Sequence, residues 1–173
     1  MQALALDASQ PARAAARGGK YLTFSLASEE YGLEILKVRE IIGIMDITCI
    51  PQMPAYIKGV INLRGKVIPV MDLRLKFGLE PAAYTEQTCV IVVDVGALVG
   101  VIVDTVEEVL DVNASQIDAP PPLGANVDTS FILGMGKVKG GVKILLDIDK
   151  VLSSEELAAR RKRLPPGSAL GSW

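Results

Sequence analysis

An internal repeat restricts the folds that this chain of 173 residues can form. The segment Tyr21–Ile42 matches the chain 68 residues later, and the segment Tyr56–Leu73 matches it 75 residues later. Aliphatic matches alone would be weak evidence in so apolar a chain, but glycines and acids also align. The aligned pairs include Gly32 with Gly100, Glu40 with Glu108, Ile41 with Val109, Gly59 with Gly134, Gly65 with Gly140, and Asp72 with Asp147. We infer that one unit of about 60 to 65 residues occurs twice.

Short strands, with no long helical segment between them, fill each unit. Apolar residues alternate from Tyr21 to Leu26, and buried runs bounded by turn residues follow. Those runs are Ile41–Ile47, Gly59–Leu63, Lys66–Met71, Val90–Val95 and Leu98–Val103. The absence of intervening helices argues against a parallel α/β sheet. A unit this small closes most readily as a β-barrel and gains stability by packing on its twin.

The pattern divides the chain into a core and two flanks. Residues 1–19 are expected to be a flexible N-terminal tail. The core covers residues 20–157, with two units at about 20–84 and 85–152, and exchange of terminal segments between the units is left open. A short helix is predicted over Ser153–Arg163 because Ser153-Ser154-Glu155-Glu156 resembles a capping box. Residues 158–173 are read as the helix end and a C-terminal tail.

The composition contains no histidine, which excludes several classes of enzyme. Neither a Ser-His-Asp triad, a Cys-His pair nor a phosphohistidine relay can be formed. The aspartates stand singly at strand ends, where they commonly form turns, so no metal site is predicted. We find no assembled nucleophile, base or cofactor-binding loop. The sequence therefore predicts a protein without catalytic activity, cofactor or metal.

Charge and hydropathy favour a soluble cytoplasmic protein. The net charge is −2 and aromatic residues make up 5% of the chain, which does not suit a nucleic-acid-binding surface. The apolar run Val95–Val103 is about half the length of a membrane span. Cys49 and Cys89 lie in apolar runs and are expected to be buried thiols in a reducing compartment.

One hairpin carries the most specific motif. The segment from Gly59 to Leu73 has the form Gly-x-x-Asn-Leu-Arg-Gly-x-x-x-Pro-x-x-Asp-Leu, and its turn would place Arg64 at the tip. Together with the upstream segment Tyr31–Ile41, this string strongly resembles the CheW-like family of chemotaxis coupling proteins. The resemblance extends from about Lys20 to Leu157.

The resemblance implies two SH3-like five-stranded β-barrels packed together, and a function without catalysis. Members of this family bridge the cytoplasmic tip of a chemoreceptor to the regulatory domain of the histidine kinase CheA. They also take part in array rings, in which self-association is a further expectation. By similarity, the receptor-binding residues are Val38, Glu40, Gly59, Arg64 and Val109, with Glu40 and Arg64 as an ion pair, and Leu123 contacts the kinase or ring.

Simpler interpretations stay open for several of these residues. Val38 can be ordinary barrel core, Arg64 a solvated turn residue, and Gly59 a strand bend common to both units. At the level of function, the alternatives are a CheW-like scaffold of a sister pathway for surface motility or biofilm formation, and a small-barrel nucleic-acid-binding protein.

Overall fold

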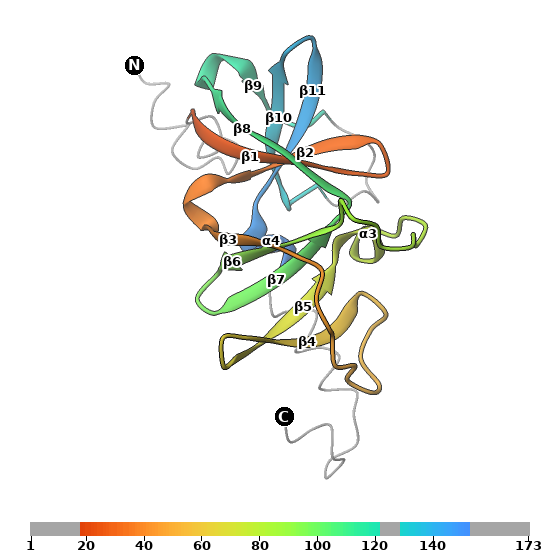
Figure 1. Ribbon diagram of the computed structural model, residues 1–173. Coiled ribbons are helices and arrows are strands. Elements are labelled where there is room, and N and C mark those ends of the chain that lie inside the picture. The colour runs from red at the N-terminus through yellow and green to blue at the C-terminus, as the bar shows by residue number, and fades with distance from the viewer. Residues whose placement is uncertain (1–17, 122–128, 153–173) are drawn as a thin grey trace.

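The computed structural model describes residues 18–121 and 129–152, which form two β-sheets, one above the other in Figure 1. The lower sheet of the figure, which we call the first barrel, has the strand order β3-β6-β7-β5-β4. Its strands are β3 (Val38–Gly43), β4 (Ile57–Leu63), β5 (Lys66–Asp72), β6 (Cys89–Asp94) and β7 (Leu98–Val103). A bridge between Thr48 and Val60 joins the segment after β3 to β4.

The upper sheet, which we call the second barrel, has the strand order β8-β1-β2-β11-β10-β9. Its strands are β1 (Gly19–Leu26), β2 (Glu29–Glu34), β8 (Thr105–Val112), β9 (Ile117–Asp118), β10 (Ile132–Val138) and β11 (Gly141–Leu146). The sixth strand is the two-residue β9, which adds to the five expected. The helical turns are η1 (Ile35–Lys37), α3 (Leu73–Lys76), η2 (Ala114–Gln116) and α4 (Ile148–Val151).

The repeat seen in the sequence is also a repeat in backbone geometry. A β-bulge lies between Ile57 and Gly59 of β4, and another lies at the equivalent place, between Ile132 and Gly134 of β10. The amide of Asp72 donates to the carbonyl of Tyr56 at 2.7 Å, and Asp147 repeats this bond with Phe131 at 2.8 Å. Each of these aspartates caps a short helix, α3 or α4, with its side chain. The two units therefore share their turns, bulges and caps.

Neither barrel consists of one contiguous half of the chain. Strands β1 and β2 belong to the first repeat in sequence but pair with β8 and β11, whereas β6 and β7 pair with β3 and β5. The exchange is made through two parallel pairings, β5 with β7 and β2 with β11. Each includes a repeat glycine, Gly100 or Gly32, at which an added Cβ would lie under 3 Å from a side chain of the same barrel. The boundary predicted at about residue 84 would therefore separate strands that pair with one another in each sheet.

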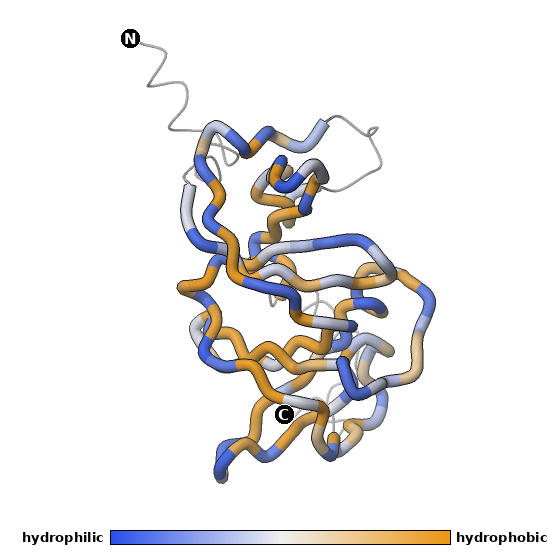
Figure 2. Tube along the Cα trace, turned by 45° about the horizontal axis from the view of Figure 1, so that its top comes forward, coloured by the Kyte–Doolittle hydropathy of each residue, from blue (hydrophilic) through white to orange (hydrophobic). Residues whose placement is uncertain are grey.

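Apolar residues from both barrels meet in a shared core. Its fully buried members include Phe24 and Leu33 of the second barrel and Leu73 and Ile91 of the first. The stacked rings of the core are Phe24, Tyr31, Phe77 and Phe131, with successive centroids 5.7, 5.9 and 5.4 Å apart. Figure 2 shows this distribution, with hydrophobic residues along the strands and hydrophilic residues at many of the turns. The shared core holds the two barrels together.

A partly buried ion pair lies where the chain passes from β7 to β8. The Arg74 guanidinium, on α3, donates to both carboxylate oxygens of Asp104, with Nε 2.8 Å from Oδ1 and Nη2 2.8 Å from Oδ2. Asp104 also accepts a 2.9 Å hydrogen bond from the amide of Ala27, in the turn between β1 and β2. This carboxylate therefore joins the helix of the first barrel to a turn of the second.

The strand predicted over Ile41–Ile47 is instead Val38–Gly43, because the chain beyond Gly43 leaves β6 and is joined to β4 by the isolated bridge between Thr48 and Val60. The prediction that both cysteines are buried is wrong, since Cys49 is exposed in that same segment and Cys89 is partly exposed. The helix predicted over Ser153–Arg163, the tail of residues 158–173 and nearly all of the tail of residues 1–19 lie outside the described residues.

Candidate functional site

The turn between β4 and β5 is a tight hairpin that fixes the position of Arg64. Arg64 and Gly65 have φ values of +53° and +89°, the pair of left-handed conformations that a type I′ hairpin requires. The Asn62 side chain stabilises the turn by accepting a 2.8 Å hydrogen bond from the amide of Gly65. The Asn-Leu-Arg-Gly sequence therefore presents the guanidinium at the tip of the hairpin.

A β-bulge in β3 places two adjacent charged residues on one face. Val38 pairs with Val93 and Glu40 with Val92, so Arg39 is an extra residue between them. In a regular strand, neighbouring side chains point to opposite faces, but a bulge redirects one of them. Arg39 and Glu40 consequently both reach the surface between β3 and the β4–β5 turn.

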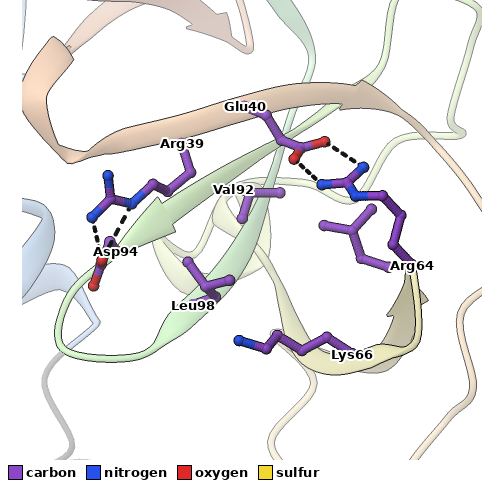
Figure 3. Close-up of a pocket in the computed structure, with 8 residues that line it drawn as sticks. Arg39, Glu40, Arg64, Lys66, Val92, Asp94 and Leu98 are labelled. Atoms are coloured by element: carbon purple, nitrogen blue, oxygen red, sulfur yellow. Dashed lines mark hydrogen bonds and ion pairs between the residues drawn. The ribbon is translucent and has the colours of Figure 1, made fainter.

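Glu40 and Arg64 form the ion pair that the family resemblance implies. Arg64 Nη1 donates to Glu40 Oε2 at 3.2 Å, and Nη2 makes a second hydrogen bond to Oε1 (Figure 3). The hydrogen bond from Arg64 lowers the pKa of Glu40 below its usual value, and the same bond raises the pKa of Arg64. The Arg64 side chain is 69% exposed, so the pair lies at the surface and contributes little to folding.

A hollow of about 600 Å³ lies beside this ion pair. Its aliphatic wall is formed by Leu63, Val92 and Leu98, and charged side chains surround the wall (Figure 3). The charged side chains are Arg39, Glu40, Arg64, Lys66 and Asp94. Apolar floor and charged rim are the usual composition of a surface that binds another protein.

A second ion pair closes the opposite side of the hollow. Arg39 donates to Asp94 Oδ2 through Nη2 at 2.6 Å and Nε at 3.2 Å. The bond from Arg39 lowers the pKa of Asp94, and the amide of Gly96 adds to the effect by donating to Oδ1 at 3.0 Å. Both carboxylates of the hollow are therefore ionised at neutral pH and satisfied by arginines of the same chain.

The structure brings some of the predicted site residues together and separates others. Val38 lies on the same strand as Glu40, but it is partly buried against the shared core. Gly59 lies on β4, where its backbone approaches Thr48 so closely that a Cβ would be 2.0 Å from the Thr48 carbonyl oxygen. Val109 is 49% exposed but lies on β8, in the second barrel. Leu123 lies outside the described residues.

The other residues of the hollow were not predicted from the sequence. Arg39, Lys66, Asp94 and Leu98 were not singled out, since adjacent charges on a strand are normally expected to point apart. The repeat did contain one unused signal: Arg64 aligns with Lys139, just as Glu40 aligns with Glu108. In the structure, Lys139 Nζ donates to Glu108 Oε2 at 2.8 Å.

The two carboxylates at this site are both bound by arginines. Across residues 18–121 and 129–152, no group of three or more cysteine and acidic side chains is placed to hold a metal ion. The same residues include no helix long and apolar enough to cross a membrane. The arrangement can hold a partner through apolar contact and charge.

The fold is a duplicated, SH3-like double barrel, and its first barrel carries a surface suited to binding another protein. The pattern that describes the CheW-like domain matches residues 20–156 of the sequence. The chain belongs to the CheW-like family of chemotaxis proteins.

Individual relatives agree with this assignment. The chain is 45% identical over 142 residues to the chemotaxis protein CheW of Klebsiella aerogenes, covering 82% of this chain and 86% of the relative. It is 35% identical to that of Rhizobium meliloti, with 82% and 92% covered. It is also 29% identical to the protein FrzA of Myxococcus xanthus, with 78% and 86% covered.

A solved structure shares the fold. The crystal structure of the scaffolding protein TtCheW from Thermoanaerobacter tengcongensis superposes with a TM-score of 0.69 at 40% sequence identity. The match covers 75% of this chain and 88% of that chain.

Proposed function

We propose that this protein is a non-enzymatic adaptor that couples the cytoplasmic tips of chemoreceptors to the regulatory domain of the histidine kinase CheA. It works in the cytoplasm, recruited to membrane-associated receptor arrays, and neither nucleic acid nor membrane insertion has a part in this function. The observation that carries the proposal is the Glu40–Arg64 ion pair, exposed on a family-specific hairpin beside an aliphatic hollow.

The receptor-binding surface in this proposal comprises Val38, Glu40, Gly59, Arg64 and Val109. The exposure of Arg64 and Val109 supports a role in binding, because neither side chain is buried in the core. Val38 and Gly59 act on the same surface from within, by supporting β3 and β4. Individual contacts of this size are weak, and attachment of many copies to one array makes the assembly stable. Self-association within array rings belongs to the same proposal.

Leu123 is proposed as a contact to the kinase or ring. It lies between β9 and β10, in the segment where the second repeat carries an insertion of seven residues relative to the first. A Leu123→Ala variant that keeps receptor binding and loses kinase binding would support this role.

Reconstitution tests the function directly. Receptor cytoplasmic fragments, CheA and the purified chain are combined, and both kinase activity and co-sedimentation of CheA with receptor are measured. The expected result is receptor-dependent control of the kinase only when the chain is present. Unchanged activity and co-sedimentation in its absence would overturn the proposal.

A relative with a name other than CheW, the protein FrzA, leaves room for a second candidate: a CheW-like scaffold of a sister pathway for surface motility or biofilm formation. The two candidates differ in the receptors and kinase encoded beside the gene. Deletion of the gene, followed by swimming and surface-motility assays, would separate them.

A further inference from the structure

Lys66 is the one cation of the first-barrel hollow that is not neutralised within the described residues. It begins β5, directly after the Arg64–Gly65 turn, and its side chain is exposed. No carboxylate of residues 18–121 or 129–152 forms an ion pair with its ammonium group. Figure 3 shows the Lys66 side chain below Leu98, on the side of the hollow away from Glu40.

The other charges of the hollow are already paired. Glu40 is bound by Arg64, and Asp94 is bound by Arg39. Three cationic and two anionic side chains line the hollow, so its net charge is +1 and the excess charge is that of Lys66. An anionic group entering the hollow would therefore meet a free ammonium rather than compete for an arginine.

The aliphatic wall adds a second requirement. Leu63 and Leu98 are partly exposed, and Val92 forms the floor. A ligand that covers this wall must itself present an apolar side chain next to its anionic group, because burying a charge alone against aliphatic groups is unfavourable.

We propose that this hollow binds a partner segment in which a carboxylate side chain stands beside an aliphatic one, with the carboxylate on Lys66. The inference rests on the proposed adaptor function and specifies the chemistry of the partner. A single ammonium suits a carboxylate better than a phosphate group, since the two arginine forks that would chelate phosphate are occupied by Glu40 and Asp94.

The second barrel provides an internal comparison. It repeats the ion pair of the first barrel as Glu108–Lys139, but the position equivalent to Lys66 is Gly141. The second barrel thus has the equivalent of the Glu40–Arg64 pair without a cation at the position of Lys66. Lys66 therefore restricts the proposed carboxylate-binding position to the first barrel.

Peptide titration followed by NMR tests the proposal on the full chain. Three end-capped peptides are compared: Gly-Ser-Leu-Glu-Leu-Ser-Gly and versions with Gln or Lys in place of Glu. The Glu peptide should shift the amide signals of Lys66, Val92 and Leu98 and bind about two- to fivefold more tightly than the Gln peptide, less so at high salt. The Lys peptide should bind most weakly.

Charge reversal supplies the decisive comparison. Lys66→Glu should reverse the order, so that the Lys peptide binds best, whereas Lys150→Glu on α4 makes the same charge change outside the hollow and should preserve it. Thermal unfolding verifies that both variants fold. Equal binding of the three peptides, signal shifts outside the hollow, or an unchanged order in Lys66→Glu would each overturn the proposal.

The titration contains neither receptor nor kinase, so its outcome is independent of the coupling assay. A chain that discriminates the peptides but fails to control CheA would overturn the proposed function and still support binding of a carboxylate at Lys66 in the hollow. A chain that controls CheA but binds the three peptides equally would support the proposed function and overturn the proposed binding of a carboxylate at Lys66.

Discussion

The Glu108 carboxylate and the Lys139 ammonium lie 2.8 Å apart, at the positions of the second repeat that correspond to Glu40 and Arg64. The correspondence includes the backbone, because Arg64 and Lys139 have φ values of +53° and +52° at the first position of a tight turn. The same strand-to-turn ion pair therefore closes both barrels. Exposed aliphatic residues also recur beside it: Ile41 and Val67 in the first barrel, and Val109 and Val142 in the second.

This equivalence provides a matched pair of charge reversals. Arg64→Glu places like charges beside Glu40, and we expect kinase coupling to fall by about tenfold or more, because like-charge contacts at a binding surface are strongly unfavourable. The free energy of unfolding should change by less than about 1 kcal/mol, since the pair is exposed. Reconstituted kinase assays and urea unfolding measure the two effects.

Lys139→Glu is the control for that prediction. It produces the same repulsion with Glu108 in the second barrel, next to only one of the proposed receptor-binding residues, Val109, so coupling should fall less than in Arg64→Glu. The double variant Glu40→Arg/Arg64→Glu should recover part of the lost coupling. If Arg64→Glu lowers stability and coupling to the same extent, Arg64 has a structural role instead.

Gly59 tests whether a family-motif residue acts through binding or through folding. Its φ is +143°, and a Cβ added to it would lie 2.0 Å from the Thr48 carbonyl oxygen, so there is no room for a side chain. Gly59→Ala should therefore lower the free energy of unfolding by more than about 1 kcal/mol. Urea unfolding measures this loss.

Gly43→Ala serves as the comparison for Gly59, because a Cβ at Gly43 has no heavy atom within 4 Å. Its effect should stay within about 0.5 kcal/mol. A stable Gly59→Ala protein that fails to couple the kinase would show that Gly59 contacts the partner directly.

The ion pair between Arg74 and Asp104 predicts how stability depends on pH. Burial raises the pKa of Asp104, but the hydrogen bonds from Arg74 and the Ala27 amide outweigh burial and leave this pKa below its usual value. A carboxyl group whose pKa is lowered by folding stabilises the protein above its unfolded pKa. This stabilisation should be lost as the pH falls below about 4.

Asp104→Asn should remove this contribution and lower the free energy of unfolding at neutral pH by about 1 to 3 kcal/mol. Asp111→Asn, which breaks the exposed pair with Lys20, should cost less than about 1 kcal/mol. Urea unfolding of both variants at neutral and acidic pH measures the difference. A wild-type and an Asp104→Asn protein with the same acid sensitivity would contradict the assignment.

The duplicated β architecture could be predicted from sequence because it depends on local signals. Turn glycines, capping aspartates and alternating apolar residues specify hairpins without reference to distant strands. The Glu40–Arg64 pair came from a family motif. The hollow could not be predicted, because it depends on a bulge at Arg39 and on the packing of β3 beside two hairpins. These elements bring together residues that are far apart in sequence.

The exchange of strands between the barrels could likewise not be predicted from local sequence signals. Alignment identifies β1–β2 and β6–β7 as equivalent pairs, but either pair has the apolar pattern to complete either barrel. The choice depends on the parallel contacts β2–β11 and β5–β7 and on the shared core, which are tertiary in origin.

Strand exchange leads to a prediction about fragments. Residues 20–84 include β3, β4 and β5 but lack β6 and β7, which lie between β3 and β5 in the first barrel. Residues 85–152 lack β1 and β2, which lie between β8 and β11. Each fragment alone would leave sheet edges and half of the shared core exposed to water, so neither should fold. Mixing them should restore the native fold by complementation, with NMR signal dispersion close to that of a continuous chain of residues 18–152. Native dispersion in either isolated fragment would contradict the exchanged arrangement, because a self-contained unit would then have to pair its own strands.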